Sequence, residues 1–196
     1  MKSMAEGKST RDGRKRVRVQ IADQCAPVLA GVKPSNIVIL GEGDAADEIR
    51  EILVSADICC DLFYEGDGKQ MWLFYRKSLI EEVLREEENR DFLKKYGYTD
   101  FWLENVMRKV HMHFLDYKLG KQEFPHEIGV ILGYPLGDVV GFIQNAGRNS
   151  KCTGCWKVYC NECEAIKYFA KFRKCKDVYW RLWNQGKSVW QLTVAA

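Results

Sequence analysis

The sequence predicts a mainly helical α+β fold with a small sheet of about four strands, on three observations. Several segments carry apolar residues at helical spacing, which is typical of helices that pack one face on a core. Two short strand-like segments, 60–65 and 70–76, flank the residues Gly-Asp-Gly-Lys and so predict a tight β-hairpin. Residues 125–146 have the pattern of two short helices joined by a turn, which resembles a helix-turn-helix corner.

The first part of the chain is predicted to alternate helices and short strands. An apolar helical stripe begins at Ile21 and includes Cys25, and Gly31 indicates where this helix ends. Residues 36–40 form a short segment rich in β-branched side chains, which predicts an interior strand. A further helix is predicted over 44–56, before the hairpin.

The second part is predicted to be largely helical. Ser78 begins an amphipathic helix with an acidic face, and Thr99 has the character of an N-cap for a longer helix. A C-terminal helix carries apolar residues from Ala165 onwards, and Ser188 caps a last short segment.

The corner at 125–146 is defined by its turn residues. Pro125 is tolerated in a first helical turn, where its missing N–H has no intrahelical partner. Gly129 and Gly133 lie four residues apart and allow another backbone to approach one face. A second helix is expected to end near Gly147, in a left-handed C-cap.

This corner lacks the surface of a DNA-reading helix. Such a helix needs Arg, Lys, Asn or Gln side chains that reach phosphates and base edges. The outward positions of the second helix are instead occupied by Leu136, Gly137, Asp138, Val140, Gly141 and Gln144. The pattern therefore favours a packed helical corner over base recognition.

Two motifs also carry a family resemblance. Residues from Phe124 read FPHEIG, LGYP, DV and GFI at fixed spacing, and residues from Trp156 read WKVY. Further segments agree, namely Cys25-Ala26-Pro27, Leu29-Ala30-Gly31, Lys33-Pro34-Ser35-Asn36 and Tyr75-Arg76. The chain closely resembles a family of uncharacterised proteins of anaerobic bacteria, roughly 200 residues long, that is classed as a domain of unknown function. The resemblance runs from about Gln24 to Leu192 and implies no activity.

Length and composition indicate a single folded domain in the cytoplasm. A chain of 196 residues can bury a core of its own, and 46% hydrophobic with 29% charged residues is ordinary for a globular protein. No apolar run approaches the roughly 20 residues of a membrane helix, and no signal peptide is recognisable, so we expect no membrane partner. In the cytoplasm the eight cysteines are expected to stay reduced.

The N-terminus is basic, whereas the remaining chain is not. Residues 1–20 carry seven basic and two acidic residues and so have a net charge of +5. Since the whole chain has a net charge of +3, the remaining residues carry about −2. Residues 1–16 lack apolar periodicity and are expected to form a disordered tail, followed by one α+β domain over 17–196. This tail could bind nucleic acid electrostatically, but a solvated extension is the favoured interpretation.

A cysteine cluster is the strongest candidate metal site. Cys152 and Cys155, and likewise Cys160 and Cys163, have the spacing with which two thiolates grip one metal ion. The residues Trp-Lys-Val-Tyr between the pairs are expected to form a fourth strand, which would hold the pairs roughly 16 Å apart. Besides reduced thiols, three alternatives are a single zinc ion on the two pairs, a redox-active cysteine pair, and an iron–sulfur cluster. The iron–sulfur cluster would use Cys155, Cys160 and Cys163, whose spacing matches the first three ligands of a plant-type [2Fe–2S] site, with Cys175 as a conceivable fourth ligand. In the family that the chain resembles, Cys155, Cys160 and Cys163 are not part of the motif.

A thiol hydrolase is the enzymatic alternative. A cysteine nucleophile with a distant histidine base is a known arrangement, and Cys25 with His126 and Glu127 would supply it if the fold brought them together. The competing interpretation is that Cys25 packs in the core and His126 bonds at a helix N-terminus. No third orienting residue or oxyanion cradle is recognisable, so the sequence does not favour an enzyme.

The sequence thus predicts a binding or regulatory module of the cytoplasm, linked to a metal if the cysteine cluster binds one. A protein partner is compatible with this function, and a nucleic-acid partner is disfavoured. The Cys25/His126 hydrolase and nucleic-acid binding through the basic tail are the two alternatives.

Overall fold

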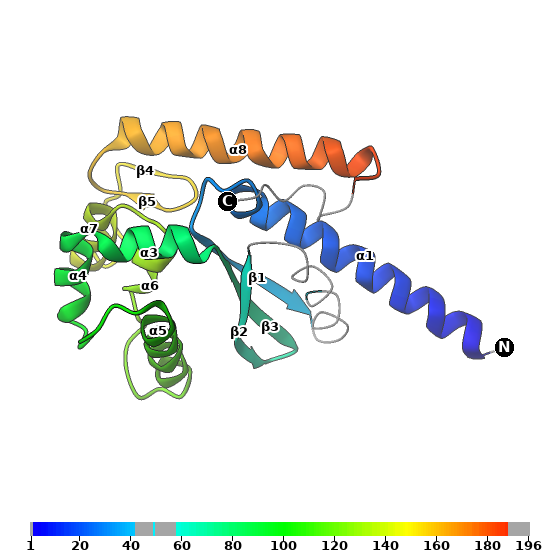
Figure 1. Ribbon diagram of the computed structural model, residues 1–196, viewed down its shortest axis with the longest axis horizontal. Helices are drawn as coiled ribbons and strands as arrows, with labels where there is room; N and C mark the ends of the chain where they lie inside the picture. The colour runs from blue at the N-terminus through cyan, green and yellow to red at the C-terminus, as the bar shows by residue number, and fades with distance from the viewer. Residues whose placement is uncertain (1, 42–48, 50–57, 188–196) are drawn as a thin grey trace. The chain divides into compact units, whose positions relative to one another are not determined.

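The structure is a computed structural model (Figure 1), and it describes residues 2–41, 49 and 58–187, with side chains from Arg16 onwards. The chain forms two compact units. Unit 1 comprises Met1–Val32, Asn36–Arg76 and Lys174–Ala196, and unit 2 comprises Lys33–Ser35 and Lys77–Arg173. The fold is mainly helical α+β, as the sequence predicts.

Unit 1 contains a long helix and a three-stranded sheet. Helix α1 is Lys2–Leu29, and the sheet has the order β1 (Ser35–Gly41), β3 (Lys69–Tyr75), β2 (Cys59–Gly66). Figure 1 shows the three strands side by side in cyan and blue. Strands β2 and β3 are antiparallel, so the predicted hairpin is confirmed.

The hairpin turn has the backbone that its sequence requires. Asp67 and Gly68 both have positive φ, 55° and 70°, which is the requirement of a two-residue type I′ turn. Because Asp tolerates this region and Gly has no Cβ, the pair fixes the register Gly66↔Lys69.

The core of unit 1 lies where α1 packs on the sheet. Ile21 and Cys25 from α1 and Phe74 from β3 are fully buried there. Arg76 is also buried, with 1% of its surface exposed, and it donates from Nε and Nη2 to the last carbonyls of α1, each at 2.7 Å. These bonds satisfy carbonyl groups that a helix C-terminus leaves without partners.

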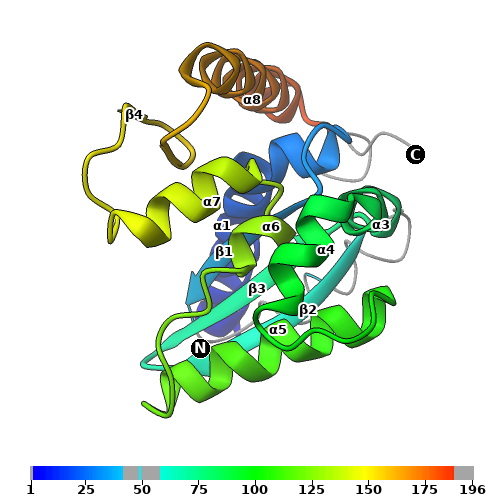
Figure 2. The same ribbon diagram turned by 90° about the vertical axis from the view of Figure 1, so that its left-hand side faces the viewer.

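Unit 2 is built mainly from helices. They are α3 (Lys77–Arg85), α4 (Glu87–Lys94), α5 (Leu103–Lys118), α6 (Ile128–Ile131) and α7 (Leu136–Gln144), followed by the first part of α8 (Glu162–Asn184). A two-stranded hairpin, β4 (Cys152–Thr153) with β5 (Lys157–Val158), follows α7. Figure 2 shows α3, α4 and α5 in green.

Two predicted helices of unit 2 differ from the sequence analysis at their ends. The helix that begins at Ser78 is interrupted at Glu86, whose backbone is extended, and Asn89 and Arg90 donate to the freed carbonyls of α3. The helix expected from Thr99 begins at Leu103. The N-cap residue of α5 is Trp102, which makes no side-chain capping bond, and the Asp100 carboxylate accepts the Trp102 N–H at 3.2 Å in the turn before the helix.

The expected fourth strand does not join the three-stranded sheet. It is reduced to Lys157–Val158 and pairs with Cys152–Thr153 in a hairpin of its own. Such a short ribbon is stable only when it packs on other elements. In unit 2 this element is α7.

The remaining predictions concern the chain ends and one internal helix. Helix α1 begins at Lys2, and Lys, Arg, Ala and Glu are good helix formers. The disorder expected over residues 1–16 stays a prediction. The boundary between a tail and one domain at residue 16 stays a prediction. The helix expected over 44–56 and the segment from Ser188 lie outside the described residues, apart from Ile49. Among the described helices, none is long and apolar enough to span a bilayer.

Candidate ligand pocket and polar network

The family motif that begins at Phe124 folds around a pocket in unit 2. The pocket has a volume of about 550 Å³ and lies between the start of α6, α7 and the β4–β5 hairpin. We call it the aromatic pocket; it is lined by Phe124, His126, Ile128, Gly129, Leu132, Tyr134, Asp138, Val139, Phe142, Thr153, Gly154, Cys155, Trp156 and Lys157.

Aromatic rings form two walls of this pocket. Tyr134 and Trp156 stack, with ring centroids 5.2 Å apart and planes at 28°. On the other wall, His126 lies between Phe124 and Phe142, and its ring centroid is 5.2 Å from each of theirs. A wall of this kind offers flat apolar surface with few polar atoms.

Three glycines permit the close packing around the pocket. A Cβ on Gly129 would lie 2.9 Å from Val139, and a Cβ on Gly141 would lie 2.4 Å from the Tyr159 Cβ. Gly133 has φ +71° and ends the turn of α6, where other residues would be strained. The helix-turn-helix-like corner is therefore present, and its glycines serve helix and hairpin packing.

The Asp138 carboxylate holds the hairpin against α7. Oδ1 accepts the backbone N–H groups of Tyr159 at 2.7 Å and Cys160 at 2.9 Å, and the Cys160 thiol at 3.0 Å. Oδ2 accepts the Trp156 indole N–H at 2.7 Å. Burial by itself raises the pKa of Asp138, but these hydrogen bonds outweigh it and hold the pKa below the ordinary value.

One cation lies at the edge of the pocket. The Lys157 ammonium donates to the Gly147 carbonyl at 2.6 Å and lies 5.8 Å from the centroid of the Phe142 ring. The Lys157 residue as a whole is exposed, so its charge faces water as well as the pocket. A ligand with an acceptor or negative charge on one edge would suit this position.

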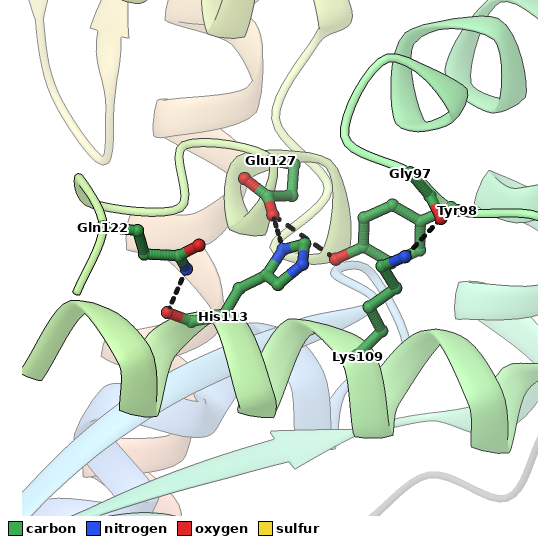
Figure 3. A network of polar contacts seen from close by, with 6 residues as sticks. All are labelled: Gly97, Tyr98, Lys109, His113, Gln122 and Glu127. Carbon is green, nitrogen blue, oxygen red and sulfur yellow. Dashed lines mark hydrogen bonds and ion pairs between the residues drawn. The ribbon is translucent and has the colours of Figure 1, made fainter. Parts of the chain in front are cut away.

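Glu127, directly after His126, does not line the aromatic pocket, and its carboxylate lies in a polar network with His113 and Tyr98 (Figure 3). Glu127 is 1% exposed, and its Oε1 lies 2.6 Å from Nδ1 of His113 on α5. The Tyr98 hydroxyl donates to the same oxygen at 3.4 Å. The other oxygen, Oε2, is buried without a hydrogen-bond partner among the described residues.

The environment of Tyr98 shows the electrostatic effect of this network. Burial raises the pKa of the Tyr98 hydroxyl, and the negative charge of Glu127 and the hydrogen bond to it raise the pKa further. Tyr98 therefore stays protonated and can act only as a donor to the carboxylate. Its ring also lies edge-on to His113, with centroids 5.7 Å apart.

A second cavity opens beside this network. It has a volume of about 490 Å³ and shares no lining residue with the aromatic pocket. We call it the polar pocket; it is lined by Tyr98, Thr99, Asp100, Asn105, Arg108, Lys109, Met112, His113, Asp116 and Gln122.

The cysteine cluster lies on the hairpin and the start of α8. Cys155, Cys160 and Cys163 are exposed, and Cys152 is half-buried. The chain reverses between β4 and β5, so Cys152 lies opposite Val158. Among the described residues, no group of three or more His, Cys, Asp and Glu is arranged to hold a metal ion. Zinc or iron–sulfur binding stays a prediction.

Carboxylates next to two of these thiols favour their protonated form. Burial and the nearby Asp138 raise the pKa of Cys160, to whose carboxylate the thiol donates. Burial and the nearby Glu162 raise the pKa of Cys152. Both shifts favour the thiol over the thiolate.

The residues of the predicted hydrolase belong to different units. Cys25 is fully buried in the core of unit 1, as the packing interpretation requires. His126 and Glu127 are in unit 2, and Glu127 bonds His113 rather than His126. The pairing of Cys25 with His126 stays a prediction.

Sequence reasoning missed His113 and Tyr98. His113 is two residues from His111, which excludes a helical metal pair, and no local pattern indicates a partner 14 residues away. A histidine on the buried side of an amphipathic helix was the available signal, because a buried polar group needs a partner.

The sequence model of a family described as "Protein of unknown function (DUF3793)" matches residues 21–193. The chain belongs to this family. The family match includes both pockets and the whole of the polar network. No curated protein and no solved structure matched the chain.

Proposed function

We propose that this member of the family is a binding module that holds a planar, mainly apolar small molecule in the aromatic pocket. The observation that supports it is a cavity of about 550 Å³ with few polar groups, lined by the stacked rings of Tyr134 and Trp156 and by the rings of Phe124, His126 and Phe142. Cavities of about 300–1,000 Å³ with this character are typical of small-molecule sites.

The polar groups at the pocket define the chemistry of the ligand. The Asp138 carboxylate is occupied by four hydrogen bonds from the hairpin. His126 and Lys157 remain as groups that can bond or attract a polar edge of the ligand. We therefore expect a bicyclic or similar aromatic compound with a carboxylate or carbonyl on one edge.

Ligand binding would also give the protein a regulatory role, because the β4–β5 hairpin forms part of the pocket and is stabilised when the pocket is occupied. A ligand that contacts both α7 and the hairpin stabilises the folded arrangement by mass action, by about 2.7 kcal/mol at a concentration 100 times Kd. A binding module of this kind can pass ligand occupancy on to a protein partner through the exposed hairpin.

The test uses indole-3-carboxylate and naphthalene-2-carboxylate as probes. Saturation-transfer NMR detects binding of each probe, and the Trp156 indole N–H resonance reports whether the site is the aromatic pocket. Thr153→Trp places a large side chain at the exposed pocket edge and is expected to weaken binding at least tenfold.

Ser78→Trp is the matched control, because Ser78 is exposed on α3 and lines neither pocket. This variant should bind the probes as the wild type does. Equal affinity in both variants, or binding that leaves the Trp156 resonance unmoved, would contradict the proposal.

A further inference from the structure

We propose that His113, oriented by Glu127, is a general base that takes a proton from a water molecule in the polar pocket during hydrolysis of an uncharged ester. This activity is independent of the aromatic pocket, which shares no lining residue with the polar pocket. His113 is the catalytic residue of the proposal, and Glu127 is a positioning residue.

The geometry of the pair fixes the histidine ring. Nδ1 of His113 lies 2.6 Å from the buried Oε1 of Glu127, and the two residues come from α5 and the turn before α6 (Figure 3). The Tyr98 hydroxyl donates to the same carboxylate oxygen from a second side. Because the carboxylate is held from two sides, it can hold the imidazole in one orientation.

This contact also decides which ring nitrogen is the base. An ionised carboxylate only accepts hydrogen bonds, so Nδ1 carries the proton and donates it to Glu127. The neutral imidazole then presents its lone pair on Nε2. Among the described residues, Nε2 has no hydrogen-bond partner, and the His113 side chain is 21% exposed and lines the polar pocket.

The buried carboxylate supports the protonated state of the base. When Nε2 accepts a proton, the positive imidazolium faces the negative Glu127 at 2.6 Å. Only 1% of Glu127 is exposed, and one of its oxygens has no hydrogen-bond partner in the described part of the chain, which is costly for a group that served only to tether α6 to α5. A buried carboxylate at this position has a function if its negative charge orients and stabilises His113.

The charges of the polar pocket favour an uncharged substrate. Its lining includes two cations and two anions, Arg108, Lys109, Asp100 and Asp116. Their formal charges sum to zero, and Lys109 donates to the Gly97 carbonyl while lying 5.2 Å from the Tyr98 ring centroid. The Asn105 amide is bonded to Asp100 and Arg108, and the Gln122 amide donates to the His113 carbonyl. The Thr99 hydroxyl and the Gln122 amide oxygen also line the pocket, and they are groups that can hydrogen-bond a neutral, oxygen-rich molecule.

The proposed step is ester hydrolysis. The proton of water binds Nε2 of His113, the water oxygen forms the new C–O bond at the ester carbonyl carbon, and the π pair of the C=O bond moves to the carbonyl oxygen. The C=O bond then re-forms, the bond to the alcohol leaving group breaks with its electron pair, and the proton on Nε2 passes to the leaving group or to solvent. The products are an acid and an alcohol, and no oxidant or reductant is needed.

The first experiment measures hydrolysis of p-nitrophenyl acetate by the full chain, followed by release of p-nitrophenolate. His113→Gln is expected to lower kcat about 100-fold, the contribution of a positioned general base. His111→Gln is the matched control, since this histidine is on the same helix and lines neither pocket. Equal rates in the two variants, or a wild-type rate no higher than that of free imidazole, would overturn the proposal.

The role of Glu127 as a positioning residue is tested by measuring kcat and KM separately, because loss of a merely structural contact would not lower kcat alone. Glu127→Gln is expected to lower kcat at least tenfold with little change in KM, because the ring is no longer held with its lone pair on Nε2. Should this variant fail to fold, the ring ¹⁵N resonances of His113 in the wild type decide the matter. A lone pair on Nε2 supports the proposal, and a proton on Nε2 of the neutral ring overturns it.

Discussion

Asp138→Asn tests how strongly one carboxylate holds the hairpin against α7. In the wild type the carboxylate accepts four hydrogen bonds, of which two come from backbone N–H groups and one from the Trp156 indole. The amide of the variant can still accept the backbone bonds through its oxygen. Its nitrogen then faces the indole N–H, so two donors oppose each other in a buried position.

The magnitude follows from these contacts. Hydrogen bonds to a charged group contribute about 1.5–3 kcal/mol, and a buried donor left without an acceptor costs about 1–3 kcal/mol. Since Trp156 is only 8% exposed, water cannot fully replace the lost acceptor. We expect Asp138→Asn to lower the free energy of unfolding by about 2–4 kcal/mol.

Urea denaturation measures this loss, and amide hydrogen exchange locates it. A local loss of 2 kcal/mol corresponds to about 30-fold faster exchange of the Tyr159 and Cys160 N–H groups. Asp116→Asn is the control, because Asp116 is 40% exposed in an ion pair with Lys121 at 3.5 Å and should change stability by about 0.5 kcal/mol or less. The reasoning is refuted if both variants behave alike and amide protection is unchanged.

The same carboxylate predicts a pH dependence. Because the pKa of Asp138 is lower in the folded state than its ordinary value of 3.8, its stabilising contribution is complete above pH 3.8. The contribution is lost as the pH falls from 3.8 through the lower folded-state pKa. The stability difference between wild type and Asp138→Asn should therefore shrink below about pH 4, and a difference that stayed constant to lower pH would contradict the assignment.

Other regions of the chain give three further predictions. Arg76→Lys leaves one of the last α1 carbonyls without its donor and should lower the free energy of unfolding by about 1–3 kcal/mol in urea denaturation, whereas an unchanged midpoint would contradict its capping role. Gly141→Ala brings a Cβ within 2.4 Å of Tyr159 and should cost about 1–3 kcal/mol by the same assay. Iodoacetamide labelling followed by mass spectrometry should modify exposed Cys155 more than about ten times faster than Cys60, whose pKa is raised by burial and neighbouring acidic groups.

The predicted metal site has its own measurement. Metal analysis and a UV–visible spectrum compare the wild type with a variant in which Cys155, Cys160 and Cys163 are all replaced by Ser. Binding of zinc or an iron–sulfur cluster requires a stoichiometric metal that the variant loses. Equal metal content in the two proteins would leave the cysteines as reduced thiols.

Local sequence chemistry determined several elements of the fold. The hairpin at Asp67-Gly68 and the corner around Gly133 follow from backbone conformations that few residues other than Gly, Asn and Asp adopt, and such preferences act over three or four residues. The apolar stripes of α3, α5 and α8 similarly follow from helical periodicity. These elements could be read from the sequence because their causes lie within each segment.

Only the tertiary structure determined the candidate sites. The bonds from Asp138 to the hairpin join residues up to 22 positions apart, and the contact between His113 and Glu127 joins residues 14 apart. No local pattern specifies such pairs, because which buried polar groups meet depends on how whole helices pack. The sequence by itself therefore determined that residues 124–147 form a helical corner, and the packing of unit 2 decided that one side of it lines an aromatic pocket while Glu127 turns inward to a histidine.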